Sequence, residues 1–317
     1  MTIERESEIA TAIVTGATGF IGSALARRLA QDGVRTVCPV RAASPRAAAL
    51  EGIPGVEVLR LASFSAAELE GALGAVPASA VFHLASYGVD PKERDPEAMI
   101  EGNVTLLARL VALATRWPLQ RFIHTGSCSE YAPAREPERL AETHLVAPTS
   151  LYGAAKAAAG IYGGGLARQL GVPLVTLRLF GVYGPGEAPH RLIPYLLDCL
   201  SRGATPELTG GEQARDLTYI DDLVEAILAA ASAPGIEAHG VYNVGTGVPV
   251  QIRAVARATA HLLGQPESAL GLGRRPYRSD ESMWVVADPG RFEAASGWRA
   301  RVSLDEGITR MIAGVRA

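Results

Sequence analysis

A tyrosine and a lysine stand four residues apart in the segment Tyr152-Gly-Ala-Ala-Lys156, at the start of a predicted helix. Four residues make just over one helical turn, so both side chains lie on one face of that helix. An isolated tyrosine has a pKa of about 10 and exchanges protons poorly at neutral pH. A lysine ammonium beside it favours the phenolate and lowers that pKa. The pair is a candidate for general acid–base chemistry, although the spacing alone is common in helices without such a function.

A second chemical signal is the glycine pattern Gly16-Ala-Thr-Gly19-Phe-Ile-Gly22, between a predicted strand and a predicted helix. Glycines allow a tight turn and a close approach of the backbone to a pyrophosphate. The amino terminus of the following helix offers free N–H donors and a positive dipole end. In this context the pattern predicts a dinucleotide site rather than a simple glycine-rich turn.

These motifs together resemble the extended branch of the short-chain dehydrogenase/reductase superfamily, and the resemblance spans nearly the whole chain. Its glycine spacing is GxxGxxG, as here, and its Tyr–Lys pair follows a strand that ends in serine, as Phe122 to Ser127 does. The resemblance implies that Tyr152 is the general acid for a substrate carbonyl. It also implies that Lys156 holds the nicotinamide ribose, and that Ser127 donates a second hydrogen bond to the carbonyl oxygen.

The same resemblance assigns further cofactor contacts. His83-Leu-Ala-Ser86 is similar to the family's HLAA segment, whose backbone passes under the cofactor, and Asn103 resembles the start of its central helix. An ordinary strand end and a helix asparagine are the simpler interpretations of these two matches. The residues assigned to cofactor binding besides Tyr152 and Lys156 are Gly16, Thr18, Gly19, Phe20, Ile21, Gly22, Arg41, Leu84, Ala85, Ser86 and Asn103.

The second predicted strand indicates which dinucleotide is used. Enzymes that use NAD usually present an acidic residue at the end of this strand, and enzymes that use NADP place a basic residue nearby. The family's acidic position falls on Val40, and Arg41 follows it. The Arg41 guanidinium can pair with a 2′-phosphate, with Ser44 or Arg46 as possible helpers. NADP(H) is therefore favoured, and NAD remains possible.

The family's extended branch acts largely on nucleotide sugars, which bind through arginines. The segment Gly210 to Asp222 is similar to the family's G-x-x-x-x-R-D-F-x-Y-V-D-D, which makes Arg215 a candidate for the substrate diphosphate. Arg278 resembles the second such arginine, and Tyr183 is also assigned to the substrate. The simpler interpretation of either arginine is a surface ion pair. The resemblance implies a dTDP-, CDP- or GDP-linked sugar as substrate.

Departures from the family pattern indicate the reaction. Cys128 and Ser129 stand where the family's 4,6-dehydratases have an Asp–Glu pair, and Glu130 comes one place too late, so dehydration is disfavoured. The run from Ser127 to Tyr131 resembles reductases such as CDP-abequose and CDP-paratose synthases, which reduce a 4-keto intermediate. Gly181 replaces a common Asn and Ala62 a common Asp, so the exact substrate stays open. A nucleotide-sugar epimerase with tightly bound NAD and a non-catalytic dinucleotide-binding protein are the alternatives.

The elements needed to position these residues follow from the hydrophobic pattern. Apolar strands are predicted at 12–15, 34–40, 56–61, 80–85, 121–125 and 174–180, and amphipathic helices at 21–30, 101–116, 151–170 and 191–202. This alternation predicts an α/β Rossmann-type fold with a doubly wound parallel sheet. We expect the dinucleotide-binding domain at 9–180, with a return to it at about 217–245, and a substrate-binding lobe at 181–317.

Composition limits the possible partners. The chain has 317 residues and a formal net charge of −3, which provides no basic field for nucleic acid or an anionic membrane. The three cysteines lack CxxC spacing, which fits a reducing cytoplasm better than a disulfide framework or a zinc site. No apolar run reaches membrane-spanning length, so we expect a cytoplasmic enzyme. The Ala-rich helices beginning near Asn103 and Tyr152 permit a homodimer.

Overall fold

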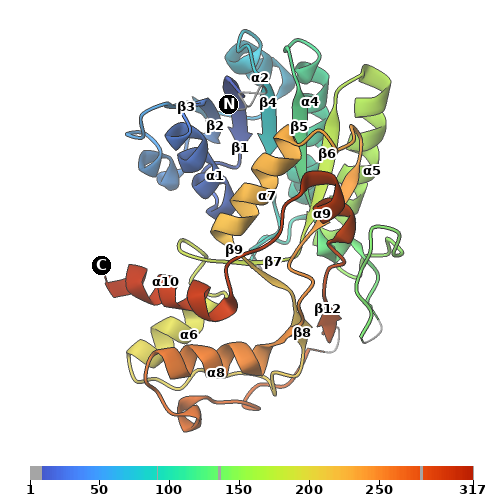
Figure 1. The fold of residues 1–317 in the computed structure, drawn as a ribbon. Helices are drawn as coiled ribbons and strands as arrows, with labels where there is room; N and C mark the ends of the chain where they lie inside the picture. The colour runs from blue at the N-terminus through green and yellow to red at the C-terminus, as the bar shows by residue number, and fades with distance from the viewer. Residues whose placement is uncertain (1–8, 91, 135–136, 279–280, 317) are drawn as a thin grey trace, which may run out of the picture.

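Seven parallel strands form one continuous sheet in the computed structural model, which describes residues 9–90, 92–134, 137–278 and 281–316 (Figure 1). The strand order is β10-β6-β5-β4-β1-β2-β3, so the order reverses between β1 and β4. Ligands of such sheets bind at the carboxyl ends of the strands beside this reversal. The predicted fold class is confirmed. The strands are β1 (Thr11–Thr15), β2 (Arg35–Arg41), β3 (Val56–Leu61), β4 (Ala80–His83), β5 (Arg121–Ser127), β6 (Leu174–Leu179) and β10 (Val241–Val244).

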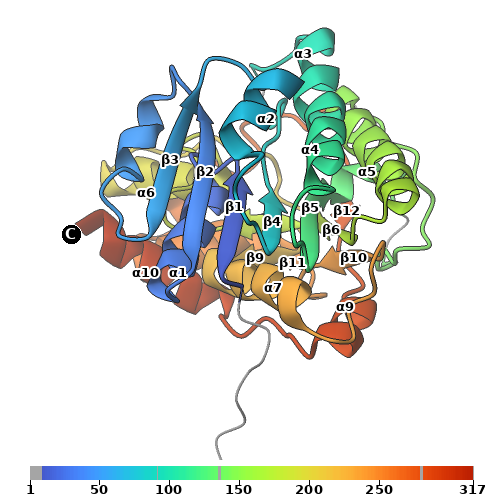
Figure 2. The ribbon, with the colours of Figure 1, turned by 90° about the horizontal axis from the view of Figure 1, so that it is seen from above.

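Helices cover both faces of this sheet, as Figure 2 shows from above. On one face lie α2 (Ala66–Leu73), α4 (Leu106–Ala114) and α5 (Leu151–Leu170), and on the other α1 (Phe20–Gln31) and α7 (Ile220–Ser232). Side chains alternate along each strand: Ala12 and Val14 pack into one hydrophobic core, and Ile13 into the other. Burial on both faces explains why the strands are almost uniformly apolar in sequence.

The helix that carries the Tyr–Lys pair has well-defined ends. The Ser150 hydroxyl accepts a hydrogen bond from the Gly153 N–H at 3.0 Å, which caps the first turn of α5. Gly171 follows the helix with φ of +70°, a left-handed conformation that favours glycine. The prediction of a helix over 151–170 is confirmed residue by residue, and the predicted strand 56–61 likewise matches β3.

Other elements differ from the sequence prediction. In place of a helix over 101–116, the structure has α3 (Pro96–Ile100), a π-helical turn η2 (Glu101–Thr105) and then α4. Asp95 caps α3 through the N–H groups of Glu97 and Ala98, so the helical path begins earlier than its apolar stripe suggested. The strand predicted at 80–85 ends at His83, and the residues after it form a loop at the sheet edge.

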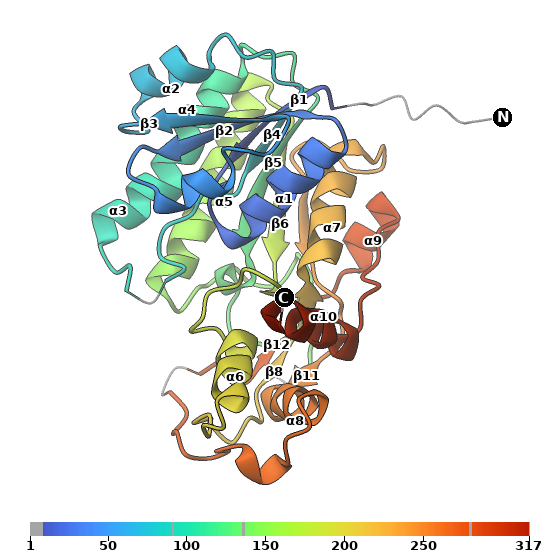
Figure 3. The same cartoon turned by 90° about the vertical axis from the view of Figure 1, so that its left-hand side faces the viewer.

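The second half of the chain adds a smaller lobe, seen below the sheet in Figures 1 and 3. Its short strands are β8 (Ala214–Arg215), β11 (Val250–Gln251) and β12 (Trp284–Val285), which form one sheet in the order β11-β8-β12, while β7 (Gly181–Tyr183) pairs with β9 (Leu217–Tyr219). Its helices are α6 (Leu192–Ser201), α8 (Ile252–Leu262) and α10 (Leu304–Arg316). The remaining short elements are η1 (Pro45–Ala49), η3 (Cys128–Glu130), η4 (Glu267–Ala269) and α9 (Gly290–Ser296).

The chain passes between the two parts more than once. After β9 it returns to the main sheet, where α7 packs against α1 and β10 pairs with β6. A core of α6 and α8 residues, including Leu196, Leu200 and Ala256, holds the lobe together. Within the described ranges, no helix has the length and apolar character that a bilayer crossing requires.

Candidate active site

The glycine-rich turn closes directly onto the loop after β4. Gly16 has φ of +73°, and a Cβ atom there would come within 2.6 Å of the Ala85 nitrogen and 2.7 Å of the Leu84 carbonyl carbon. A Cβ atom on Gly22 would come within 2.2 Å of the Gly16 carbonyl oxygen. Only glycine fits at either position, because a Cβ atom would overlap backbone atoms that cannot move aside. Two of the segments assigned to the cofactor therefore form one surface.

The amino terminus of α1 is open above this turn. Gly19 precedes the helix, and no side chain caps its first N–H groups. Those groups have no acceptor within the helix, so they are available to an anionic group. Thr18, Gly19, Phe20 and Ile21 are all partly exposed here. This cradle fits the diphosphate of a dinucleotide.

Arg41 is the last residue of β2 and is exposed. It forms no ion pair with any residue in the described ranges. Glu51 pairs with Arg60 at 2.8 Å, and Arg60 also donates to the carbonyl of Ala42, the residue after Arg41. Among the described residues, the end of β2 thus presents a guanidinium that pairs with no carboxylate.

The Asn103 side chain holds the loop after β4 through hydrogen bonds to Ser86 and Tyr87. Its side-chain oxygen accepts hydrogen bonds from the Ser86 hydroxyl at 2.8 Å and the Tyr87 N–H at 3.3 Å. Its side-chain nitrogen donates to the carbonyls of Tyr87 and Met99. The amide has used its hydrogen-bonding capacity and is 1% exposed, and one of its bonds positions Ser86. The π-helical turn that carries it is a form often found at functional sites.

Ser127, Tyr152 and Ser86 come together at the carboxyl ends of β4 and β5. The hydroxyls of Ser86 and Ser127 both lie close enough to the Tyr152 phenol to favour its ionised form. Helix α5 approaches closely because residue 153 is glycine: a Cβ atom there would lie 2.1 Å from the Ser129 carbonyl oxygen. Three predicted residues from three separate elements thus meet at one hydroxyl. Sequence spacing suggested Ser127 and Tyr152, and the contact with Ser86 required the fold.

Burial raises the pKa of the Tyr152 phenol, and the nearby hydroxyls of Ser86 and Ser127 only partly oppose that shift. The expectation that Lys156 lowers this pKa is wrong for the protein without ligands, because desolvation of the phenolate dominates. The consequence is chemical: Tyr152 carries its proton at neutral pH and can donate it.

Lys156 lies one turn further along α5 and is 2% exposed. Burial lowers its pKa to about 8, and the charge of Glu130 opposes this shift. Two stacked histidines, His83 and His124, lie near Lys156. Burial lowers the pKa of both imidazoles, and the positive charge of Lys156 adds to that shift. Both imidazoles are therefore neutral at physiological pH.

Both oxygens of the Glu130 carboxylate are already paired within the protein. Its Oε1 atom accepts the Ser127 N–H at 2.7 Å, and its Oε2 atom pairs with Arg178 Nε at 2.7 Å. Arg178 also donates to the Tyr131 hydroxyl at 3.0 Å. With 1% of its surface exposed, this carboxylate is unavailable as a base for a bound sugar.

Arg215 lies beside the turn that follows Ser127. Burial raises the pKa of the Cys128 thiol to about 11, and the positive charge of Arg215 is the main opposing influence. The Arg215 guanidinium pairs with Glu281 at 2.6 Å. Arg278 is exposed, and its carbonyl accepts the Glu281 N–H at 3.2 Å, so the two predicted arginines belong to adjoining segments.

Asp216 was missed as an organising residue, although it stands beside Arg215 in the quoted motif. It is 1% exposed and accepts hydrogen bonds from the N–H groups of Thr246, Gly247 and Ala287 and from the Thr246 hydroxyl. These bonds tie the strand that carries Arg215 to the loop after β10. Its adjacency to Arg215 was the only signal in the sequence.

Tyr183 requires a correction. It was assigned to the substrate, but it is 1% exposed and belongs to the main hydrophobic core. Its ring packs edge-on against Tyr219, and its hydroxyl donates to the Ser303 carbonyl at 3.3 Å. Gly307 of α10 closes over it, since a Cβ atom there would lie 2.2 Å from the hydroxyl. Tyr183 therefore holds α10 against β7.

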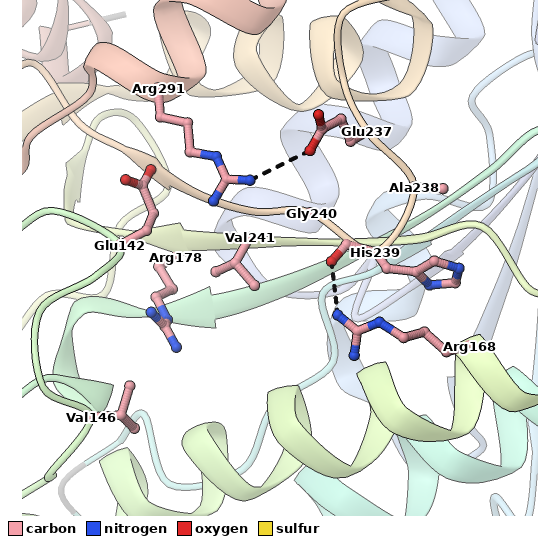
Figure 4. Close-up of a pocket in the computed structure, with 10 residues that line it drawn as sticks. All are labelled: Glu142, Val146, Arg168, Arg178, Glu237, Ala238, His239, Gly240, Val241 and Arg291. Atoms are coloured by element: carbon pink, nitrogen blue, oxygen red, sulfur yellow. Dashed lines mark hydrogen bonds and ion pairs between the residues drawn. The ribbon is translucent and has the colours of Figure 1, made fainter.

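A separate depression of about 510 Å³ lies at the outer edge of β10 (Figure 4). Arg168, Arg178 and Arg291 line it together with Glu142 and Glu237. Arg291 pairs with Glu237 at 3.6 Å across its rim. None of the residues assigned to cofactor or substrate is among its lining residues, so this depression is not the candidate active site.

Comparison with known proteins agrees with the geometry. Residues 12–245 match the family model described as "NAD dependent epimerase/dehydratase family". Similar curated proteins include a probable UDP-glucuronate 4-epimerase of Rhizobium meliloti, 26% identical over 95% of each chain, and CDP-abequose synthase of Salmonella typhimurium, 26% identical over 95% of this chain and 96% of that one.

Solved structures show the same fold. MoeE5 in complex with UDP-glucuronic acid and NAD is 30% identical, with a TM-score of 0.82 over 96% of this chain and 99% of that one. UDP-glucose 4-epimerase of Thermotoga maritima has a TM-score of 0.86 at 24% identity, over 96% and 98% of the chains. The family match covers most of the chain and includes the glycine turn, the Tyr–Lys pair and Arg215. The chain is an enzyme of the NAD-dependent epimerase/dehydratase family, within the extended short-chain dehydrogenases/reductases that the sequence resembled.

Proposed function

We propose that this enzyme reduces the C4 keto group of a nucleotide-linked 4-keto-6-deoxyhexose, using NADPH, in deoxysugar biosynthesis. The observation that carries the choice of NADPH is Arg41 at the end of β2, which is exposed and pairs with no acidic residue in the part of the chain that the structure describes. A 2′-phosphate at this position gains a charge-assisted hydrogen bond, whereas an NAD ribose finds no carboxylate to accept its hydroxyls.

The proposed cofactor contacts follow the surfaces described above. The open turn of Thr18 to Gly22 takes the diphosphate, the loop of Leu84 to Ser86 lies beneath the cofactor, and Lys156 holds the nicotinamide ribose. Gly16 and Gly22 provide the close packing, and Asn103 fixes the loop through Ser86. Bound NADPH supplies the hydride.

Tyr152 is the proposed general acid. Reduction of a ketone leaves an alkoxide that needs a proton, and burial keeps that proton on Tyr152 at neutral pH. Ser127 donates a second hydrogen bond to the oxygen as it gains negative charge. Lys156 places its ammonium on the same helix face, where it stabilises the phenolate that proton donation leaves.

The substrate diphosphate is proposed to bind Arg215, with Arg278 as the second cation. Arg215 is positioned for this role by its place beside the Ser127–Cys128 turn. A bound diphosphate would replace the Glu281 carboxylate as the partner of its guanidinium. This arrangement supports binding of the linked sugar next to Tyr152.

Dehydration is disfavoured on chemical grounds. Removal of the C5 proton and the C6 hydroxyl needs an acid–base pair beside the sugar, but Cys128 and Ser129 occupy those positions. Cys128 has a raised pKa and stays a neutral thiol, and the Glu130 carboxylate is bound to Arg178.

A second candidate is a nucleotide-sugar 4-epimerase that retains NAD. The likeness to MoeE5, whose structure contains UDP-glucuronic acid and NAD, favours it. Both reactions use the same Ser–Tyr–Lys group, so the cofactor decides between them. The protein is purified without added nucleotide, denatured, and the released dinucleotide identified by chromatography. We expect little bound dinucleotide and saturable binding of added NADPH; stoichiometric NAD in the released material would support the epimerase.

The assembly is proposed to be a cytoplasmic homodimer. Ile161 and Tyr162 on α5 are 69% and 58% exposed, and Ile100 and Leu151 are also exposed nearby. Exposed large apolar side chains on the neighbouring helices α3 and α5 are suited to contact with a second copy of the chain. The three cysteines are free thiols, which fits a reducing compartment.

A further inference from the structure

Glu130 is a buried carboxylate that the reaction described above does not use. It projects from η3, the turn after Ser127, and is 1% exposed. Its two oxygens have separate partners: Oε1 accepts the Ser127 N–H, and Oε2 accepts from Arg178 Nε, each at 2.7 Å. A buried carboxylate is costly unless it is paired in this way. Its position is therefore closely defined.

Gly126 leaves room for this carboxylate between β5 and α5, and Gly160 of α5 lies at contact distance on its other side. A Cβ atom on Gly126 would come within 2.5 Å of Glu130 Oε1, and one on Gly160 would lie 3.9 Å from Oε2. Gly160 is four residues after Lys156 in α5, so both lie on the same face of that helix. The Glu130 carboxylate consequently faces the side of α5 that carries Lys156.

The other groups around Lys156 cannot balance its charge. His83 of β4 and His124 of β5 are neutral, since burial and Lys156 itself lower their pKa. Tyr152 on α5 keeps its proton, because burial raises its pKa. Arg178 of β6 is a cation that already pairs with Glu130.

We infer that Glu130 is a positioning residue of the active site, which fixes Ser127 through its N–H and holds the Lys156 ammonium in its charged form. The part concerning catalysis rests on the proposed function; the part concerning Lys156 does not. With Glu130 neutral, Lys156 loses its proton at lower pH, and the phenolate left by Tyr152 loses its stabilising charge. The Ser127 N–H also loses its hydrogen bond to a charged acceptor.

The chain offers a direct measurement, because it contains only two lysines, Lys92 and Lys156. Protein labelled with ¹³C at the lysine ε-carbon gives two signals, assigned with a Lys92→Arg variant. Lys92 is exposed and serves as the internal reference. In the native chain we expect Lys156 to titrate with a pKa of about 8, which is the result of burial and of the opposing charge of Glu130. In Glu130→Gln, we expect its pKa to fall by about one unit or more.

Two further variants separate charge from structural damage. Glu130→Gln leaves Arg178 buried without its carboxylate, so the double variant Glu130→Gln/Arg178→Gln replaces the ion pair by two neutral amides. It should show the same fall in the Lys156 pKa. Glu142→Gln is the matched control: among the described residues this carboxylate accepts the Asn243 N–H at 2.7 Å and no other hydrogen bond, and the variant should leave Lys156 unchanged.

An unchanged Lys156 titration in both Glu130 variants would overturn the inference. So would an equal shift in Glu142→Gln, because the effect would then not come from Glu130. Where the native enzyme reduces a nucleotide-linked ketone, the alkaline limb of its kcat profile should move to lower pH together with the Lys156 titration. Absence of reduction by the native enzyme would count against the proposed function alone, since the lysine signals are read without substrate.

Discussion

The guanidinium of Arg215 is held by the carboxylate of Glu281, with 2.6 Å between Nη2 and Oε1. Their side chains are 24% and 18% exposed, so the pair is only partly screened by water. A substrate diphosphate and Glu281 need the same donors. Glu281 therefore competes with the substrate diphosphate for the Arg215 guanidinium.

Replacing Glu281 tests this competition. Glu281→Gln removes the charge and keeps the size, so the KM for the nucleotide sugar should fall about tenfold, roughly the effect of one charge-assisted hydrogen bond. Arg215→Ala should raise that KM and leave the KM for NADPH unchanged. A higher KM for the sugar in Glu281→Gln would show that Glu281 assists binding.

Arg41→Asp tests the choice of dinucleotide. The native enzyme should prefer NADPH over NADH by more than about tenfold, because a contact to the 2′-phosphate contributes roughly 1.5–3 kcal/mol. The variant should reverse the preference, measured as dissociation constants by calorimetry. Arg257→Asp on α8, which makes the same change in net charge, should have no effect. Equal affinity of the native enzyme for both dinucleotides would contradict the role of Arg41.

Tyr152→Phe removes one hydroxyl and keeps the packing of the ring. Loss of a general acid typically lowers the rate by about 10²–10⁴, so kcat at saturating NADPH should fall by this factor while NADPH still binds. Ser127→Ala should cost less, because it removes one of two donors, and Lys156→Met should impair both binding and turnover. Tyr162→Phe on the exposed side of the same helix is the control. Normal turnover by Tyr152→Phe would exclude the mechanism.

Glu187 gives a prediction for stability. Its Oε2 atom is buried without a hydrogen-bond partner among the described residues, and burial raises its pKa from 4.5 to about 7. The folded state therefore binds a proton more tightly than the unfolded state, so stability falls as pH rises from about 4.5 to 7 and is level above that. The loss is about 3 kcal/mol at most.

Urea unfolding of Glu187→Gln at pH 5 and pH 8 measures this loss. The variant should be more stable than the native chain at pH 8 and nearly equal to it at pH 5. Glu57→Gln, at an exposed ion pair with Arg35, should differ from the native chain by the same small amount at both values. A gain for Glu187→Gln that does not depend on pH would mean that its carboxyl group does not titrate in this range.

The sequence predicted the parts of the site that depend on local pattern. The glycine turn lies between a strand and a helix, and Tyr152 and Lys156 share a helix turn; both follow from residue spacing. Contacts between distant segments did not follow, such as Gly16 against Leu84 and Ala85, or Ser86 against Tyr152. They depend on which strands become neighbours, and β1 and β4 are separated by two intervening strands in the chain.

Two assignments show where local pattern misleads. Tyr183 lies in a motif beside the site, but its side chain is on the buried face of β7. A strand of three residues is too short for the sequence pattern to show which face is buried. Glu130 was judged only as a misplaced catalytic acid. Its partners Arg178 and Ser127 come from β6 and β5, and no periodicity in the sequence connects them.

The central claim is that hydride passes from NADPH to C4 of a nucleotide-linked ketosugar and stays there. NADPH carrying deuterium at the transferable position of the nicotinamide should be incubated with dTDP-, CDP- and GDP-linked 4-keto-6-deoxyhexoses in parallel. Mass spectrometry and NMR of the sugar product then locate the label. With at least one of these substrates we predict one deuterium at C4 and one NADP⁺ released for each product formed. Interconversion of C4 epimers of UDP-glucose or UDP-glucuronic acid, with no deuterium incorporated and no NADPH consumed, would contradict the account.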